Sequence, residues 1–124
     1  TVRGAPCFAA VLQDLRAILE AHPLVQHSRF DEKAFDVACA FAGLPELKSD
    51  WSDSVAIARK AWPELRGNGG YGLGLLKKVL GLKFRHHDAG EDARAAAQVV
   101  LKAEAVMGRQ IGILNTSRQL AFDF

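Results

Sequence analysis

The stretch Leu24-Val25-Gln26-His27-Ser28-Arg29-Phe30-Asp31 is the part of the sequence that decides the fold. Its first four residues follow Pro23 and form a short apolar run of the length expected for a buried strand. Ser28 comes next, with Asp31 three residues later, which is the spacing of a helix cap and its N3 acceptor. The stretch therefore predicts a strand, a cap and a helix in direct succession.

Asp31 has two interpretations at this position. The simpler one is that its carboxylate stabilises the first turn of the helix, where the helix dipole favours negative charge. The alternative is that Asp31 lies at the carboxyl end of a buried strand, which is where open α/β sheets gather ligands and ions. In that case the carboxylate would face a metal ion.

Helical periodicity continues on both sides of this unit. A helix is expected after Pro6, running to about Glu20, as part of the core, and the helix after Ser28 is expected to end at Gly43. We expect its buried stripe to consist of Phe30, Ala34, Val37, Ala38 and Phe41. Three more helices are expected at 53–62, 72–80 and about 89–107, with a glycine-rich turn at 67–70. Five helices and one or two strands fit the pattern, and no clear period follows residue 107.

The composition is that of one globular domain. The 124 residues are 49% hydrophobic and 24% charged, and the formal net charge of +2 is too small to indicate a nucleic-acid partner by itself. Cys7 and Cys39 match no zinc-binding spacing and fit a reducing compartment. No stretch approaches the length and apolarity of a membrane span, so we expect a cytoplasmic protein without a membrane partner.

The stretch His87-Asp88-Ala89-Gly90-Glu91-Asp92 is the second informative feature. Asp88 is the expected N-cap of the last helix, with Glu91 three residues later. His87 and Asp92 then occupy the N′ and N4 positions, whose side chains meet across the first turn. This spacing would bring a general base and a metal ligand together. The alternative is a histidine–carboxylate pair that only decorates a helix cap.

Together, in this order and separation, residues 27–31 and 87–92 resemble the second and third motifs of the DEDDh-type 3′-5′ exonucleases, a family that includes replicative proofreading subunits. The resemblance extends to three further landmarks, Thr1-Val2-Arg3-Gly4-Ala5-Pro6, Asp53-Ser54 and Tyr71-Gly72-Leu73. It implies an α/β, ribonuclease H-like exonuclease fold, present here as its mostly helical C-terminal part. The exonuclease domain would comprise residues 1–107, followed by a C-terminal tail at 108–124.

The resemblance also implies an activity, the hydrolysis of phosphodiester bonds at single-stranded or frayed 3′ ends of DNA or RNA with two Mg²⁺ or Mn²⁺ ions. Asp92 would bind the first metal ion, Asp31 would support that site, and His87 would deprotonate the attacking water. Ser28 and Phe30 would contact the terminal nucleotide, although Phe30 is equally a candidate core residue. Four basic residues near the motifs, Arg29, Lys33, Arg85 and Arg94, are candidates to meet phosphates or are simply solvated.

The chain departs from the family at the first motif, an Asp-x-Glu for which no residues precede Thr1. Asp31 and Asp92 alone offer few anionic oxygens, so we expect weak metal binding and doubtful catalysis by this chain alone. The strand at 24–27 would also lack a neighbour, which favours a homodimer or a partner that covers the sheet edge. An inactive nucleic-acid-binding or assembly module is therefore the alternative, and a small helical protein whose motifs are only caps is a third.

Overall fold

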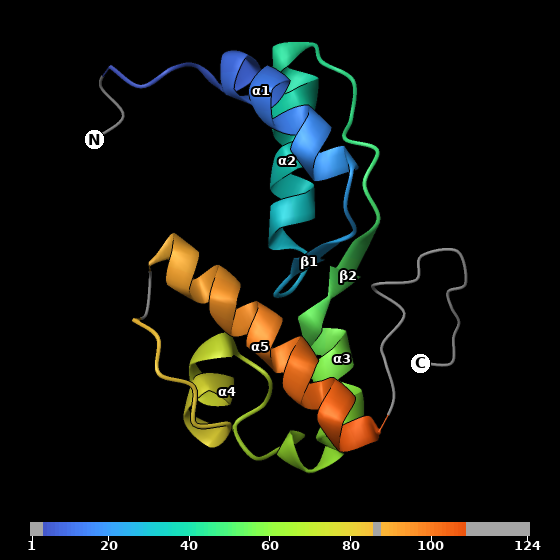
Figure 1. The fold of residues 1–124 in the computed structure, drawn as a ribbon, viewed down its shortest axis with the longest axis vertical. Helices are drawn as coiled ribbons and strands as arrows, with labels where there is room; N and C mark the ends of the chain where they lie inside the picture. The colour runs from blue at the N-terminus through green and yellow to red at the C-terminus, as the bar shows by residue number, and fades with distance from the viewer. Residues whose placement is uncertain (1–3, 86–87, 109–124) are drawn as a thin grey trace.

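The computed structural model describes residues 4–85 and 88–108, in which two short strands lie between two groups of helices (Figure 1). Within these residues there are five α-helices and two strands, as the sequence predicted. None of the described helices is long and apolar enough to cross a bilayer. The elements in chain order are α1 (Phe8–Glu20), β1 (Leu24–Gln26), α2 (Phe30–Ala42), β2 (Trp51–Asp53), α3 (Ser54–Ala61), the 3-10 turn η1 (Pro63–Leu65), α4 (Leu73–Val79) and α5 (Ala89–Met107).

The two strands are parallel and connect the two groups of helices. Leu24, Val25 and Gln26 of β1 are in register with Trp51, Ser52 and Asp53 of β2. Helix α2 makes the crossover between them, as parallel strands require. The pair α1 and α2 lies at one end of the strands and the group α3, α4 and α5 at the other (Figure 1).

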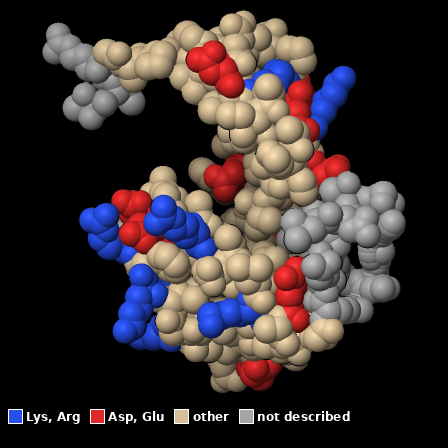
Figure 2. Space-filling view, in the orientation of Figure 1, with Lys and Arg blue, Asp and Glu red and all other residues tan. Residues whose placement is uncertain are grey.

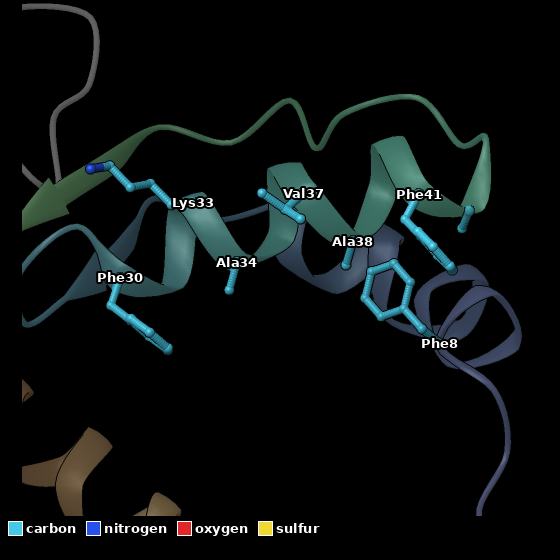
Figure 3. A pocket seen from close by; sticks show the side chains of 8 residues that line it. Phe8, Phe30, Lys33, Ala34, Val37, Ala38 and Phe41 are labelled. Carbon is cyan, nitrogen blue, oxygen red and sulfur yellow. The ribbon is translucent and has the colours of Figure 1, made fainter.

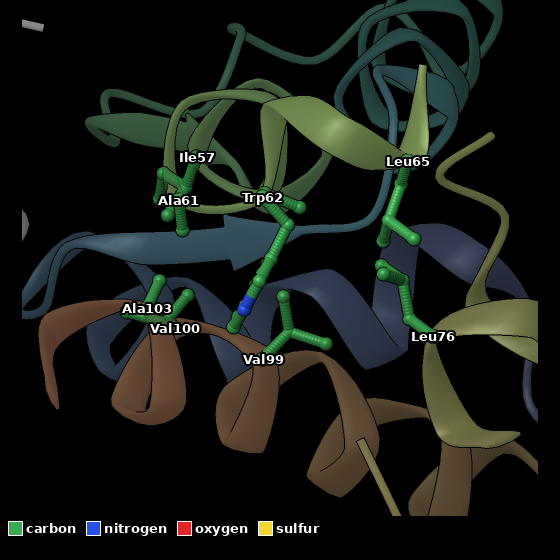
Figure 4. Close-up of a cluster of buried hydrophobic side chains, with 9 residues drawn as sticks. Ile57, Ala61, Trp62, Leu65, Leu76, Val99, Val100 and Ala103 are labelled. Carbon is green, nitrogen blue, oxygen red and sulfur yellow. The ribbon is translucent and has the colours of Figure 1, made fainter. Parts of the chain in front are cut away.

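Most of the core lies between α3, η1, α4 and α5 (Figure 4). Alanines on α3 and α5 allow these two helices to approach closely, because Ala58 and Ala103 are both completely buried. Trp62 fills the space between them and is 8% exposed. The remaining buried members of this cluster are Ile57, Ala61, Leu65, Leu76, Val99 and Val100. Full burial of each large apolar side chain contributes about 1.5–3 kcal/mol, so this cluster carries much of the stability.

The pair α1 and α2 has a smaller core, and here the predicted stripe of α2 is wrong. Phe30, Val37 and Phe41 are 74%, 69% and 94% exposed. The face that α2 buries carries Cys39 and Phe35, whose ring lies 6.2 Å from that of Phe8 and 6.1 Å from that of Trp51. The periodicity misled because α2 has apolar residues on two faces, and the neighbouring elements cover only one.

Helix α1 also differs from its expected role as a core helix. Leu12 is buried, but Leu15 and Ile18 are 38% and 59% exposed. Its extent from Phe8 to Glu20 agrees with the sequence prediction. The helix therefore contributes one buried row to the fold and leaves part of its apolar surface in solvent.

The helix ends test the predicted caps. Asp88 is the N-cap of α5 and accepts a hydrogen bond from the Glu91 backbone N–H, and Gly43 ends α2 with a left-handed φ of 69°. Ser28 is not the cap of α2, because the helix begins at Phe30 after Arg29. Ser28 instead has a φ of 73°, which is unusual for a residue with a side chain. It forms the sharp bend between β1 and α2.

Candidate active site

A cleft of about 600 Å³ opens between α2 and α5 beside the end of β1. Asp31 and Asp92, the two carboxylates predicted to bind metal, both line it. They come from distant parts of the sequence, so the fold brings together what the two motifs suggested. The other lining residues are Leu19, Leu24, Val25, Gln26, His27, Phe35, Trp51, Leu73, Ala89, Ala93 and Ala96.

Both carboxylates are held in the first turn of a helix. Asp31 follows the first residue of α2, and Asp92 is the fourth residue of α5, where its backbone N–H donates to the Asp88 carbonyl at 2.8 Å. The helix dipole makes this environment favourable for negative charge. Two helix starts therefore present carboxylates to one mostly apolar cleft.

The other three predicted site residues have different positions. His87 lies outside the described residues. Ser28 is exposed at the bend between β1 and α2 and is not among the residues that line the cleft. Phe30 lines a second, shallow groove on the outer face of α2, of about 660 Å³ (Figure 3). That groove is almost entirely apolar, and its remaining lining residues are Phe8, Lys33, Ala34, Val37, Ala38, Phe41 and Ala42.

His27 anchors the bend that carries Ser28 and Asp31. Its Nδ1 lies 2.7 Å from the Ser54 hydroxyl, and its Nε2 lies 2.8 Å from the Tyr71 carbonyl oxygen. Because a carbonyl only accepts, Nε2 carries a proton, so in the neutral ring Nδ1 is an acceptor. The Ser54 hydroxyl beside it also lies 3.1 Å from the Gln26 carbonyl oxygen, so its single proton is shared between these two acceptors. One imidazole thus connects the end of β1 to the start of α3 and to the segment before α4.

Burial determines the charge of this histidine. Loss of solvent lowers the pKa of His27 from its ordinary value of 6.5, while the Tyr71 carbonyl and the Asp53 carboxylate oppose the shift less strongly. The neutral ring is therefore favoured near neutral pH. A neutral His27 suits a structural anchor, and its two ring nitrogens are both engaged within the protein.

Asp53 and Gln26 complete the support of the bend. The Asp53 Oδ1 accepts from the Ser28 backbone N–H at 2.9 Å and from the Val55 backbone N–H at 2.8 Å. The Gln26 side chain, 3% exposed, accepts from the Glu32 backbone N–H at 2.9 Å and donates to the Glu32 carboxylate at 3.2 Å. These bonds orient the first turn of α2, and with it Asp31, toward the cleft.

The geometry can be compared with known proteins. A family model described as exonuclease, of the RNase T type, matches residues 1–100. The chain belongs to the RNase T exonuclease family. A DNA polymerase III PolC-type from Streptococcus suis is 30% identical over 101 residues, which cover 80% of this chain and 7% of that polymerase. The chain therefore spans a small part of the length of this relative, and no solved structure gives a significant match.

Family membership confirms the predicted fold class. Five helices with two short parallel strands agree with the mostly helical part of an α/β, ribonuclease H-like exonuclease fold. The match over residues 1–100 includes both sequence motifs. The cleft that contains Asp31 and Asp92 is therefore the candidate active site of an exonuclease-family domain.

Lys77 contacts the candidate site through Asp92, although it is not among the residues that line the cleft, and the motifs did not indicate it. Its ammonium lies 2.6 Å from the Asp92 Oδ1, and its side chain is only 8% exposed. One signal in the sequence was available, because Lys77 lies four residues after Leu73 and three before Leu80, on the apolar face of α4. A lysine on a buried face needs an acidic partner that compensates its charge.

The described residues supply the right kind of metal ligand but too few of them. Carboxylate oxygens suit Mg²⁺ and Mn²⁺. Residues 4–85 and 88–108, however, contain no group of three acidic, histidine or cysteine side chains that would hold an ion. Asp31 and Asp92 are therefore the kind of ligand that the metal ions of an exonuclease need, but two carboxylates are too few to hold them.

Proposed function

We propose that this domain is a 3′-5′ exonuclease that hydrolyses phosphodiester bonds at DNA or RNA 3′ ends. The observation that carries the proposal is the meeting of Asp31 and Asp92 in one cleft of an exonuclease-family chain. Mg²⁺ or Mn²⁺, two ions in a complete domain, would polarise the scissile phosphate when bound. The carboxylates missing from the described site would come from an Asp-x-Glu segment, which these 124 residues do not contain.

The residues of this chain take separate roles in the proposal. Asp31 and Asp92 hold the metal ions, and His87 accepts a proton from the attacking water, since an imidazole titrates near neutral pH. Ser28 contacts the terminal nucleotide through its exposed position at the bend. Phe30 stacks on the terminal base, for which a 74% exposed ring is available.

Positive charge supports a nucleic-acid substrate. Lys and Arg side chains gather over α4 and the start of α5, with acidic side chains among them (Figure 2). The exposed basic residues of α4, of the segment between α4 and α5, and of the start of α5 include Lys78, Lys83, Arg85 and Arg94. Such residues contact phosphates without regard to base sequence, which suits an enzyme that removes any 3′ nucleotide.

A second candidate function is an inactive nucleic-acid-binding or assembly module. The observation in its favour is that the Asp92 carboxylate already contacts the Lys77 ammonium, in a site with few other metal ligands. A homodimer or a partner that pairs with the outer edge of β1 belongs to this alternative, because β1 pairs only with β2 in the described part of the chain. The cytoplasmic location stays a prediction under both candidates.

The test is the degradation of a single-stranded oligonucleotide in Mn²⁺ by the 124-residue chain and by a version extended with an Asp-x-Glu strand. A 5′ label follows the direction, because removal from the 3′ end yields a ladder of shortening products. Asp31→Asn, Asp92→Asn and His87→Ala are the site variants. Asp36→Asn is the matched control, since Asp36 is exposed on α2 and lies outside the cleft lining.

A ladder that depends on Mn²⁺ and is lost in the three site variants, but kept in Asp36→Asn, supports the exonuclease. If neither length of chain degrades the oligonucleotide, while both retard it in a native gel, the inactive module is the correct function. Activity that survives all three site substitutions would show that this cleft is not the active site.

A further inference from the structure

Lys77 is one of three buried polar or charged residues in the described part of the chain, with Gln26 and Ser54. Besides the 2.6 Å contact to the Asp92 Oδ1, its ammonium lies 3.5 Å from the Arg85 carbonyl oxygen. Burial of an ammonium is unfavourable unless acceptors compensate it. The Lys77 ammonium is therefore held in one place by these two acceptors, whereas the neighbouring Lys78 is exposed to solvent.

The contact places a positive charge on a proposed metal ligand. A divalent ion bound to Asp92 would lie within a few ångströms of the Lys77 ammonium, because both contact the same carboxylate. Like charges at such a distance repel strongly in a partly buried site. The Asp92 side chain is 30% exposed, so water screens this repulsion only in part.

We propose that Lys77 is a resident cation beside the candidate active-site cleft, which neutralises Asp92 and opposes the binding of a divalent ion there. The proposal rests on the proposed function only in taking Asp92 as a metal ligand. It makes Lys77 a residue that sets the metal affinity without touching the substrate.

The experiment compares the 124-residue chain with Lys77→Met, which keeps the length of the side chain and removes its charge. Lys78→Met is the matched control on the same helix. The double variant Lys77→Met with Asp92→Asn removes both charges of the pair. Two quantities are measured, the affinity for Mn²⁺ from the spectroscopic signal of the free ion, and the thermal unfolding midpoint in EDTA and in Mn²⁺.

We expect Lys77→Met to bind Mn²⁺ about tenfold more tightly than the unsubstituted chain, because the repulsion is gone. Its unfolding midpoint should be lower in EDTA, where Asp92 lacks the Lys77 ammonium, and should rise more when Mn²⁺ is added. Lys78→Met should change neither quantity. The double variant Lys77→Met with Asp92→Asn should have a higher unfolding midpoint in EDTA than Lys77→Met alone, and it should not show the tighter binding of Mn²⁺. If Lys77→Met does not fold, Lys77→Gln replaces it, since an amide still donates to Asp92.

Equal or weaker Mn²⁺ binding by Lys77→Met overturns the proposal, as does the absence of Mn²⁺ binding in every variant. The proposal is also overturned if Lys77→Met lowers the unfolding midpoint by the same amount in EDTA and in Mn²⁺, because a side chain that only packs would give that result. The proposed function is judged separately by the oligonucleotide. If Lys77→Met binds Mn²⁺ more tightly but no oligonucleotide is degraded, the role of Lys77 stands and the exonuclease function is rejected. If the oligonucleotide is degraded but the Mn²⁺ affinity is unchanged in Lys77→Met, the exonuclease function stands and the role of Lys77 is rejected.

Discussion

At the residue scale, His27 connects three segments through one side chain. It bonds to Ser54 at the start of α3 and to the Tyr71 carbonyl before α4, and it precedes the bend that leads to Asp31. A histidine in a motif that resembles those of exonucleases is easily taken for a catalytic group. The two short bonds within the protein indicate that this one positions the motif.

His27→Ala should therefore destabilise the fold. The loss of two hydrogen bonds, each with a net contribution of about 0.5–1.5 kcal/mol, predicts a decrease of about 1–3 kcal/mol in the free energy of unfolding. Urea denaturation measures it. His22→Ala is the control, because His22 is exposed, and it should change stability by less than about 0.5 kcal/mol. Equal effects of the two substitutions would contradict the anchoring role.

The same residue predicts a pH dependence of stability. Because the pKa of His27 is lower in the folded chain, the unfolded chain takes up the proton first as the pH falls below the ordinary value of 6.5. The stabilisation is then fully present above that value, is lost as the pH falls toward the folded pKa, and changes no further below it. Urea denaturation from about pH 7.5 to about pH 5 should show a shallower decline for His27→Gln than for the unsubstituted chain. Parallel declines would exclude His27 as the source.

At the scale of the element, Asp53 joins two structures through one oxygen. As the N-cap of α3 it accepts from the Val55 N–H, and it also accepts from the Ser28 N–H in the bend after β1. The parallel pairing of β1 with β2 places Asp53 beside Gln26, so the strand register makes the second bond possible. The cap of one helix thereby fixes the approach to another.

Asp53→Ala should lower the free energy of unfolding by about 1–3 kcal/mol, because it removes the oxygen that accepts both hydrogen bonds. Asp53→Asn keeps an acceptor oxygen and should lose less than half as much. Asp50→Ala, at an exposed position just before β2, is the control and should have little effect. Thermal or urea unfolding distinguishes these outcomes. A loss in Asn as large as in Ala would mean that charge, and not the hydrogen bonds, is responsible.

At the scale of the whole molecule, stability is unevenly distributed. The cluster between α3, α4 and α5 contains most of the buried apolar side chains, whereas α2 exposes a row of them (Figures 3 and 4). The candidate active site lies between these two parts, lined by α2 on one side and α5 on the other.

This distribution predicts that truncation of two large apolar side chains will change stability by very different amounts. Leu76→Ala should cost about 2–5 kcal/mol, because Leu76 is completely buried in the main cluster. Phe41→Ala removes a larger side chain that is 94% exposed and should change stability by less than about 0.5 kcal/mol. Urea denaturation of both variants is the measurement. A large loss in Phe41→Ala would show that another surface covers this part of α2.

The sequence alone predicts most of the local structure of this protein, apart from the start of α2, where Ser28 is not the cap. The extents of the helices, the N-cap Asp88 and the left-handed end at Gly43 follow from interactions within one or two turns, and the structure agrees with them. The two motifs led to the family and to the prediction that Asp31 and Asp92 share a site, and both residues line one cleft. Residue types and spacings were sufficient there because each motif is short and carries its own geometry.

The tertiary structure decided which surfaces are covered and which side chains meet. The periodicity of α2 revealed an apolar stripe, but only the packing of Phe8 and Trp51 against Phe35 shows that the opposite face is buried. The contact of Lys77 with Asp92 and the bonds of His27 likewise join residues far apart in the chain. Such contacts depend on how elements dock, and docking is governed by the shape and burial of whole surfaces, which no local spacing encodes.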